Sequence, residues 1–338
     1  MILGTLVFLL GGVAAATYLL PFRGVKGWSY ETGWLVCVIA GWLVFPLVFD
    51  ALVVPDFGKV LGSASAATLA RSFGFGVLWG VGALCWALMV RYLGIGLGLG
   101  IGAGLCAATG TLLPPICTGH AADLVATPSA RMVLGGVGIA LFGIVAVGIA
   151  GRLKEGEMSE EAKKKAVAEF DFRKGLITAI IAGVASAGIN FGLQGAPELE
   201  KAALDAGCSP TWAGMPVLTV VLWGGVLTQL IWSICQHRKN RSFGDYTVRF
   251  NPLNYLLSIV DGIIGVMQFV LQKAGEPLMG EFRYISFAVL MSSAVFFSAI
   301  LGVFLGEGQG TSLRTKALLS VGIVVLAVGF TVMALGGK

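Results

Sequence analysis

The order of apolar runs constrains the fold of this chain more than any other feature of its sequence. Ten apolar stretches are divided five and five by one hydrophilic, basic stretch at residues 152–174. A Gly-Val-Ala-x-Ala motif that begins at Gly12 in the first half returns at Gly183 in the second. A unit with an odd number of membrane spans, once duplicated, places its second copy upside down relative to the first. The sequence therefore predicts an all-α integral membrane protein with ten transmembrane helices in two inverted five-helix repeats.

Two further echoes support a duplication. The segment that begins at Trp79 returns at Asp261, and the segment that begins at Val137 returns at Val321. Both separations are close to that of the first motif. The basic stretch marks the boundary between the copies, so we expect the first repeat at residues 1–151, a basic linker at 152–174 and the second repeat at 175–338.

The composition indicates that the chain lies within a lipid bilayer. Apolar residues make up 57% of the chain and charged residues only 12%, whereas about a quarter of an ordinary soluble domain is charged. Each apolar stretch is near the ~20 residues that a membrane-spanning helix needs. The expected spans are residues 2–22, 32–54, 70–92, 95–117, 131–151, 175–196, 211–236, 254–272, 284–305 and 315–336.

The distribution of basic residues predicts the orientation. Sixteen of the 23 Lys and Arg residues lie in the odd-numbered connections, which the positive-inside rule places in the cytoplasm. We therefore expect a multi-pass protein of the inner (plasma) membrane with both termini outside and the linker 152–174 inside. In that linker, Lys163, Lys164 and Lys165 alternate with glutamates, which favours a solvated helix over a nucleic-acid site.

Small residues and prolines predict how some helices pack and bend. Gly94, Gly98 and Gly102 recur every four residues, a spacing that lets helix backbones approach closely in lipid. Pro46 and Pro216 lie within expected spans, where a missing N–H bends a helix. We expect tight packing of the fourth span and kinks in the second and seventh.

Metal and enzyme chemistry find little support in the sequence. The six cysteines are scattered without Cys-x-x-Cys spacing, and His120 and His237 both fall in expected loops. Such cysteines are typical of small apolar side chains within helices. We predict no cofactor, no metal and no enzymatic activity.

Asp261 is the clearest candidate for chemistry. It lies about seven residues inside the eighth span, and Gly265, Gln268 and Gln272 follow it at i+4, i+7 and i+11 on one helical face. An ionisable group deep in lipid costs roughly 2.5–3.5 kcal/mol on insertion scales and is a functional candidate by default. Low dielectric disfavours the charged form of a carboxyl group, so such a group can exchange a proton near neutral pH. The competing interpretation is a structural partner for a polar group on a neighbouring helix.

The sixth span carries a second polar stripe. Ser186, Asn190 and Gln194 recur at i+4, and Phe191 lies beside them. Carboxamides donate and accept hydrogen bonds at once, as sugar hydroxyls do. The stripe therefore fits either a sugar-binding cavity or hydrogen bonds between helices.

Aromatic side chains offer flat apolar surfaces for a sugar ring. Trp79 and Trp86 share a face of the third span, and Tyr18 and Phe22 share a face of the first. A lone Trp or Tyr in a membrane protein is more often an interface anchor or a packing residue. Charged residues near span ends, among them Asp50 and Lys273, are expected to be solvated or to extend toward the headgroups.

Several strings resemble the L-rhamnose/proton symporters of the drug/metabolite transporter superfamily over nearly the whole length. The strings that carry the resemblance are PFR-x-VK-x-WSYET at 21–32, FG-x-x-WG-x-G at 75–82, RYLG at 91–94, GTL at 110–112 and SAG at 186–188, with YIS at 284–286 and GE at 306–307. The resemblance implies a central sugar cavity lined by the first four helices of each repeat, and sugar uptake driven by protons. Glu31 and Gln268 match family positions, whereas Asp261 and Asp50 depart from the family pattern.

We therefore predict a secondary transporter that imports a deoxysugar, most simply L-rhamnose, with protons and by alternating access. Asp261, or else Glu31, carries the proton in this hypothesis. A uniporter or exporter of another metabolite is the alternative, and a receptor or scaffold without transport is a more distant one. The expected partners are a small sugar and the bilayer, and the sequence is compatible with a homodimer. The expected sugar-binding residues are Asn190, Gln194, Gln268, Gln272, Trp86, Trp79, Tyr18 and Phe191.

Overall fold

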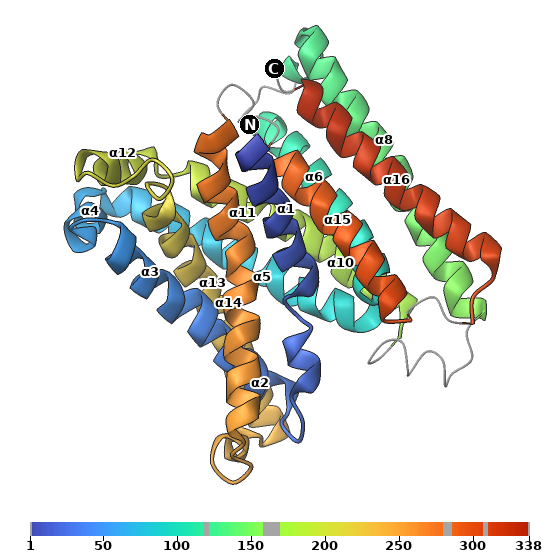
Figure 1. Cartoon of the computed structure of the whole chain (residues 1–338), viewed down its shortest axis with the longest axis horizontal. Helices are drawn as coiled ribbons and strands as arrows, with labels where there is room; N and C mark the ends of the chain where they lie inside the picture. Colours follow the sequence, from blue (N-terminus) through green and yellow to red (C-terminus); the bar gives the residue numbers. More distant parts are fainter. Residues whose placement is uncertain (1, 118–121, 158–169, 280–285, 307–309, 337–338) are drawn as a thin grey trace. The chain divides into compact units, whose positions relative to one another are not determined.

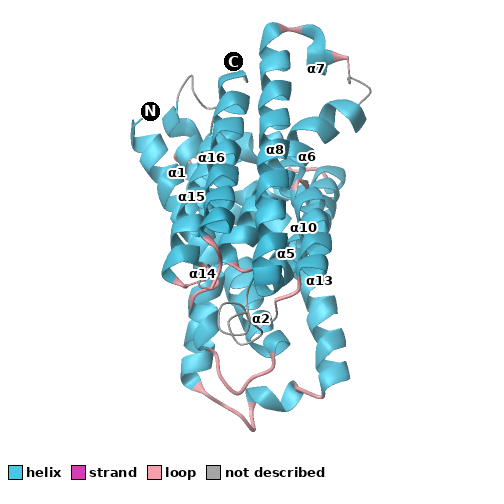
Figure 2. Ribbon diagram, turned by 90° about the vertical axis from the view of Figure 1, so that its right-hand side faces the viewer, coloured by secondary structure: helices cyan, strands magenta, loops and turns pink. Residues whose placement is uncertain are grey.

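The computed structural model describes residues 2–117, 122–157, 170–279, 286–306 and 310–336. All regular secondary structure among these residues is helical (Figure 2). The expected linker helix at 152–174 falls partly outside the described residues. Three further charged residues that lie near expected span ends, Glu281, Arg283 and Glu307, fall wholly outside them. The all-helical membrane class predicted from composition is confirmed.

Eight helical segments are long and apolar enough to cross a bilayer, by length and composition. Two shorter apolar segments, Leu97–Thr109 and Val289–Phe304, lie where the fourth and ninth spans are expected. The eight segments are Ile2–Gly24, Tyr30–Val53, Ala66–Leu93, Pro128–Lys154, Phe172–Gln194, Met215–Asn240, Pro252–Met279 and Leu313–Met333.

The chain divides into two compact units, and each unit draws segments from both predicted repeats. Unit 1 comprises residues 1–16, 82–187 and 279–338, and unit 2 comprises residues 17–81 and 188–278. The two units are therefore not the two predicted repeats. The units are defined by contacts in space, whereas the repeats are defined by their order along the sequence.

Unit 1 is a bundle of long helices. Its elements are α1 (Ile2–Thr17, as far as Ala16), the second half of α5 (Ala66–Leu93), α6 (Ile95–Cys117), α7 (Asp123–Ala126), α8 (Pro128–Glu157), α10 (Phe172–Ser186), α15 (Ser286–Phe304) and α16 (Leu313–Gly336). The expected close packing of α6 is present, because a Cβ added at Gly102 would meet Met89 and Trp86, and one added at Gly104 would meet Ile144. Glycines on α6 therefore admit neighbouring side chains at short range.

The closest helix pair in unit 1 is α8 with α16, which run side by side over their whole lengths (Figure 1). Gly136 of α8 faces Met333, Gly143 faces Leu326, and Val147 faces Gly322. Residue numbers rise along one helix as they fall along the other, so the pair is antiparallel. The opposite face of α8 carries the exposed residues Phe142, Val145 and Ile149, an apolar stripe that suits contact with lipid.

Unit 2 contains shorter and more irregular helices. Its elements are η1 (Pro21–Gly24), α2 (Tyr30–Val38), η2 (Ile39–Val44), α3 (Phe45–Val53), α4 (Phe57–Ser63), the first half of α5, α11 (Gly188–Gln194), α12 (Pro197–Asp205), α13 (Met215–Asn240), η3 (Phe243–Tyr246) and α14 (Pro252–Gly275). The short helix α12 begins at Pro197, where a proline fits the first helical turn.

Proline positions explain one irregularity in unit 2. The second span changes from α to π geometry at η2, where the Phe45 N–H bonds to Ala40 O, five residues back. This wide turn directly precedes Pro46, which has no N–H to continue the α-helical ladder. The expected kink in the second span is thus a π segment. The kink expected at Pro216 is wrong, because this proline lies in the first turn of α13, where no N–H is needed.

Glycines bring the helices of unit 2 into backbone contact. A Cβ added at Gly41 would collide with the Gly262 carbonyl of α14, and one added at Gly80 would collide with the backbone of Gly225 on α13. Such close approach requires glycine on both helices. These contacts fix the positions of the polar side chains described next.

Candidate substrate and proton site

Asp261 lies in the interior of unit 2 and has few polar neighbours. Its side chain is fully buried, and Oδ2 accepts a hydrogen bond of 3.1 Å from the Cys37 thiol of α2. The Phe22 backbone amide lies close enough to interact with the carboxylate, but Oδ1 has no well-formed hydrogen bond to the described residues. A buried carboxylate with one thiol donor and one nearby amide is less well stabilised in its charged form than one that accepts several strong hydrogen bonds.

Tyr18 lies beside the same stretch of α14, although not in the expected manner. The helix α1 ends at Thr17, so Tyr18 occupies a turn and Phe22 the 3-10 segment η1. The prediction that Tyr18 and Phe22 share one face of a helix is therefore wrong. The Tyr18 ring nevertheless packs 3.2 Å from where a Cβ of Gly265 would stand, one helical turn from Asp261. The structure brings Tyr18 and Asp261 into electrostatic range of each other.

A continuous row of aromatic rings runs through unit 2. Trp34 and Trp42 are 6.3 Å apart between ring centroids, Trp42 and Trp79 are 4.6 Å apart, and Trp79 and Phe269 are 5.4 Å apart. The row continues from Trp34 to Tyr30, at 5.9 Å and stacked. Trp79 is therefore a buried member of an aromatic core that includes Phe269 of α14, and these rings offer the apolar faces that a sugar ring can stack on.

Gln229 is a buried polar residue within the aromatic core that the sequence analysis did not select. Its Oε1 accepts a hydrogen bond of 2.8 Å from Trp34 Nε1, and its Nε2 donates at 2.6 Å to the Gly80 carbonyl. The carboxamide therefore joins α2, α5 and α13. The sequence signal that could have identified Gln229 is its position as a polar residue in the middle of the apolar seventh span.

Glu31 lies at the start of α2 in a dense hydrogen-bonded cluster formed with His237, Ser242, Asp245 and Tyr246. The cluster is buried except for Tyr246. Glu31 Oε1 accepts from Ser242 Oγ at 2.5 Å, and from Asn240 Nδ2 at 3.0 Å. The expectation that charged groups near span ends are solvated is thus wrong for Glu31.

A directional chain of hydrogen bonds leads to Glu31. His237 Nδ1 is 2.7 Å from Ser242 Oγ, and His237 Nε2 is 2.8 Å from Tyr246 Oη. Because Ser242 donates to Glu31, the consistent tautomer of His237 donates from Nδ1 to Ser242 and accepts at Nε2 from Tyr246. His237 is therefore not a loop residue, as expected from the sequence, but a fully buried side chain of α13.

Asp245 completes the cluster on its outer side. Burial opposes ionisation of its carboxyl, but hydrogen bonds from Ser29 N–H at 2.8 Å and Thr32 Oγ1 at 3.0 Å outweigh burial. With Arg249 also nearby, these donors hold the pKa of Asp245 below the ordinary value of 3.8. A charged Asp245 thus fastens the start of α2 to the segment that follows α13.

The expected stripe of the sixth span is divided at Ala187, where a turn separates α10 from α11. Asn190 is half-buried, Gln194 is exposed, and neither carboxamide bonds to the described part of the chain. Phe191 stacks on Phe75 with centroids 5.3 Å apart. These residues lie in unit 2, whereas Ser186 belongs to unit 1.

The remaining candidates are dispersed. Gln268 Nε2 donates to Gly265 O at 2.9 Å. Nε2 of the buried Gln272 lies 3.5 Å from Oε1 of Glu276, the residue that caps the end of α14. Each amide nitrogen thus has a partner on its own helix or at the end of that helix. Trp86 belongs to unit 1, where it packs on Gly102. The structure thus places Asp261 and Gln268 in α14 and Tyr18 and Trp79 against it, all in unit 2, whereas Trp86 belongs to unit 1.

Two further charged residues are buried rather than solvated as expected. Asp50 of α3 accepts a hydrogen bond of 2.6 Å from Thr219 Oγ1, and Lys273 pairs with Glu276 at 3.2 Å between Nζ and Oε2. Each has a side chain less than a tenth exposed. Among the described residues, no group of three His, Cys, Asp or Glu side chains is arranged to hold a metal ion.

Comparison with known proteins covers the chain from end to end. Residues 1–338 match the family described as L-rhamnose-proton symport protein (RhaT). The chain is similar to the L-rhamnose-proton symporter of Cronobacter sakazakii, with 36% identity over 99% of this chain and 97% of that protein. It is 35% identical to the symporter of Salmonella paratyphi A and 34% identical to that of Escherichia coli, with the same coverage of both chains.

One solved structure, titled only as the crystal structure of a protein, shares the fold. It aligns over 95% of both chains with a TM-score of 0.50 and 15% sequence identity. At that identity the likeness concerns the fold alone.

Proposed function

This chain belongs to the L-rhamnose-proton symport family, and we propose that it imports L-rhamnose together with protons. The observation that carries the proposal is the match over residues 1–338, at 34–36% identity to proteins named L-rhamnose-proton symporters. The buried aromatic row and carboxylates of unit 2 supply the chemistry that a sugar and a proton require. The cargo is thus a small neutral sugar, and the coupling ion is H⁺.

We propose that ten transmembrane helices form two inverted repeats, which contacts within the units support. The chain passes between the units after Ala16 and again after Ala187, and these two points are separated by the same offset as Gly12 and Gly183 of the repeated motif. Gly12 packs on Ser293 of α15, and Gly183 packs on Leu105 of α6. These are equivalent contacts between the first and ninth spans and between the sixth and fourth.

The helices α8 and α16 support the inversion itself. They are the fifth span of each proposed repeat, and they pack antiparallel. Copies that crossed the membrane in the same direction would place their fifth spans parallel. With the excess of Lys and Arg in the odd-numbered connections, this topology puts both termini outside the inner membrane and residues 152–174 in the cytoplasm. The homodimer stays a prediction.

We propose that Asp261 carries the proton and that the sugar binds along the adjacent face of unit 2. Asp261 accepts a hydrogen bond from the Cys37 thiol and lies near the Phe22 amide, and binding or release of one proton would change its charge beside Tyr18. Asn190 and Gln194 have carboxamides available for sugar hydroxyls. Trp79 contacts Phe269 of α14, the helix that also carries Asp261 and Gln268. Glu31, at the end of its hydrogen-bond chain, is the alternative proton carrier.

One proton per sugar is energetically sufficient for scavenging. One elementary charge that crosses 100 mV releases about 2.3 kcal/mol, and tenfold accumulation costs about 1.4 kcal/mol. A single coupled proton therefore sustains about 50-fold accumulation. Alternating exposure of the site to the two sides of the membrane would convert this gradient into net uptake.

Uptake of labelled L-rhamnose into proteoliposomes tests the proposal. We expect L-rhamnose to accumulate in the liposomes when the proton gradient is directed inward, with the outside more acidic. We expect no accumulation when a protonophore collapses that gradient. Uptake that equilibrates without accumulating would identify a uniporter, and accumulation only against the reversed gradient would identify an exporter. Thermal-shift measurements with L-rhamnose, L-fucose, D-ribose and D-glucose test the choice of sugar, because a bound ligand stabilises the fold by mass action.

A further inference from the structure

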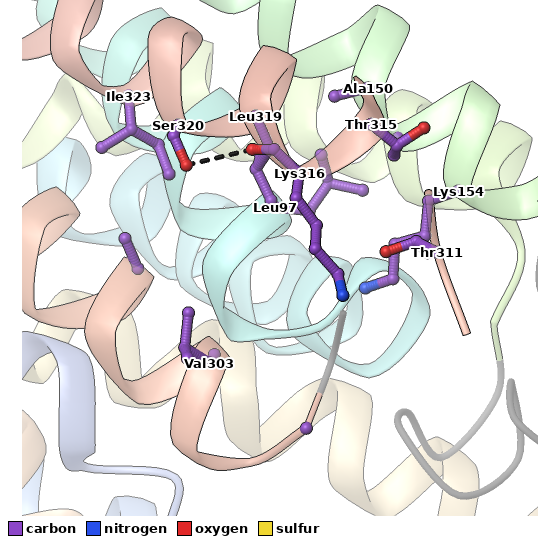
Figure 3. A pocket seen from close by; sticks show the side chains of 14 residues that line it. Leu97, Ala150, Lys154, Val303, Thr311, Thr315, Lys316, Leu319, Ser320 and Ile323 are labelled. Atoms are coloured by element: carbon purple, nitrogen blue, oxygen red, sulfur yellow. Dashed lines mark hydrogen bonds between the residues drawn. The ribbon is translucent and has the colours of Figure 1, made fainter. Parts of the chain in front are cut away.

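Several helical serines of this chain satisfy their hydroxyl group on their own helix. In the wall of a cavity of unit 1, Ser320 Oγ donates to the Lys316 carbonyl, four residues earlier, at 3.0 Å (Figure 3). Ser293 and Ser298 of α15 donate to carbonyls three residues earlier, each at 2.8 Å. Such bonds are the ordinary arrangement of a serine within a helix. A buried helical serine without one is an exception that needs a physical reason.

Ser258 of α14 is such an exception. Its side chain is fully buried, and its Oγ has no hydrogen bond to the described residues. A Cβ added at Gly33 of α2 would lie 3.2 Å from this oxygen and 3.0 Å from the Phe22 ring. The hydroxyl therefore faces a glycine, which offers it no polar side chain. A buried hydroxyl without a partner costs free energy, and native proteins rarely leave one unpaired.

The same face of α14 carries a second unpaired atom, Asp261 Oδ1. The two residues are three apart in the helix, which puts their Cβ atoms about 5–6 Å from each other. Both side chains face α2, Ser258 at Gly33 and Asp261 at Cys37. Because helical side chains lean toward the helix N-terminus, the Asp261 carboxyl leans over the turn that carries Ser258. An unpaired hydroxyl and an unpaired carboxyl oxygen are thus neighbours within unit 2.

Three other groups near Asp261 come from outside α14. The Cys37 thiol donates to Oδ2, the Phe22 amide lies close to the carboxylate, and Tyr18 lies within electrostatic range. No Lys or Arg among the described residues forms an ion pair with Asp261. An amide N–H only donates and a thiol accepts weakly, so neither suits the O–H that a protonated Asp261 presents. The Ser258 hydroxyl both donates and accepts, and it lies on the same helical face.

We propose that Ser258 is a positioning residue for the Asp261 proton and bonds to Oδ1 in both protonation states. When the carboxylate is charged, the Ser258 O–H donates to Oδ1. When Asp261 is protonated, its O–H donates to Ser258 Oγ, and the Ser258 hydrogen turns to a carbonyl of the preceding helical turn. A change between staggered χ1 rotamers of Ser258 makes the contact.

A partner that serves both states has a consequence for transport. Asp261 can gain and lose its proton without leaving a buried polar group unpaired in either state, so neither state is held much more strongly than the other. This role rests on the proposed function of Asp261 as the proton carrier.

Infrared difference spectroscopy of the purified chain in detergent, between acidic and alkaline buffer, tests the contact without sugar or transport. The C=O stretching band of protonated Asp261 is the band that Asp261→Asn removes. We expect Ser258→Ala to shift this band, because the frequency of a carboxylic acid depends on its hydrogen bonds. The matched control is Ser233→Ala, which removes another fully buried and unpaired serine hydroxyl, in α13 of the same unit, and should leave the band in place.

Proteoliposome uptake gives the second readout. Ser258→Ala should lower the initial rate of proton-driven L-rhamnose uptake about 2- to 12-fold, the range that loss of one hydrogen bond implies. Exchange of labelled for unlabelled sugar should persist, since it needs no release of the proton. Ser258→Cys keeps the size of the side chain with a weaker donor and acceptor, so it should give a smaller band shift and a smaller loss of uptake. This variant keeps the test decisive if Ser258→Ala impairs folding.

The outcomes separate this proposal from the proposed function. The absence of any band that Asp261→Asn removes, an unshifted band in Ser258→Ala, or an equal shift in Ser233→Ala would each overturn it. Equal losses of uptake and exchange in Ser258→Ala would also overturn it, because a merely structural serine affects both. A shifted band together with proton-driven accumulation that survives Asp261→Asn would contradict the transport role of Asp261 and leave its contact with Ser258 standing.

Discussion

Two buried carboxylates in unit 2, Asp261 and Glu31, have opposite surroundings. Asp261 receives one hydrogen bond from a thiol, and its Oδ1 lacks a well-formed partner among the described residues. Glu31 receives two hydrogen bonds and stands at the end of a chain through Ser242 and His237 to Tyr246. The protein thus stabilises one carboxylate thoroughly and the other hardly at all.

The difference teaches which carboxylate suits each task. A group that must gain and lose a proton at little cost cannot be held strongly in either state. A fully bonded group instead organises the segments that donate to it. Asp261 therefore suits proton coupling, and Glu31 suits the fastening of α2 to α13.

The largest expected effect separates these two roles. Asp261→Asn removes the exchangeable proton and should abolish the proton-driven accumulation of L-rhamnose, which is about 50-fold at 100 mV, while exchange of labelled for unlabelled sugar persists. Glu31→Gln, the matched change in the other carboxyl, should retain accumulation. Proteoliposome uptake measures both, and the reverse pattern would assign the proton to Glu31.

The packing beside Asp261 gives the next largest effect. A methyl group at Gly41 would collide with the Gly262 carbonyl, so Gly41→Ala should lower the free energy of unfolding by about 1–3 kcal/mol. Gly74→Ala, on α5 with open space around it, is the control and should change stability little. Denaturant unfolding in detergent compares them, and equal stability of the two variants would contradict the close contact of η2 with α14.

Gln229, in the aromatic core of the same unit, yields a smaller effect. A double-mutant cycle of Trp34→Phe and Gln229→Leu isolates their hydrogen bond of 2.8 Å. The coupling energy should be about 0.5–1.5 kcal/mol in unfolding free energy. A coupling near zero would mean that the indole and the carboxamide do not meet.

The smallest effect concerns pH and the hydrogen-bonded cluster. The folded pKa of Asp245 lies below its ordinary value of 3.8, so its contribution to stability is complete above that value and is lost as the pH falls through the lower folded value. Asp245→Asn should therefore be less stable than the parent chain near neutral pH, and the difference should narrow below pH 3.8. Thermal unfolding followed across pH measures this, and a constant difference would contradict the linkage.

The sequence by itself determined the all-helical membrane class of the molecule and marked Asp261 as a candidate. These follow from one-dimensional physics, because the length of an apolar run is matched to the bilayer and an ionisable residue within such a run is costly wherever it lies. The family resemblance, which whole-length similarity confirmed, likewise needs only the order of residues.

Only the tertiary structure decided which polar groups meet. Gln229 bonds to Trp34 and Gly80, and Glu31 is reached through Ser242 by His237 of α13, in the other half of the sequence. Helical periodicity places a side chain on a face of its own helix but does not say which helix lies opposite. That choice depends on where glycines such as Gly41 and Gly80 let two backbones touch, and this is a property of both partners together.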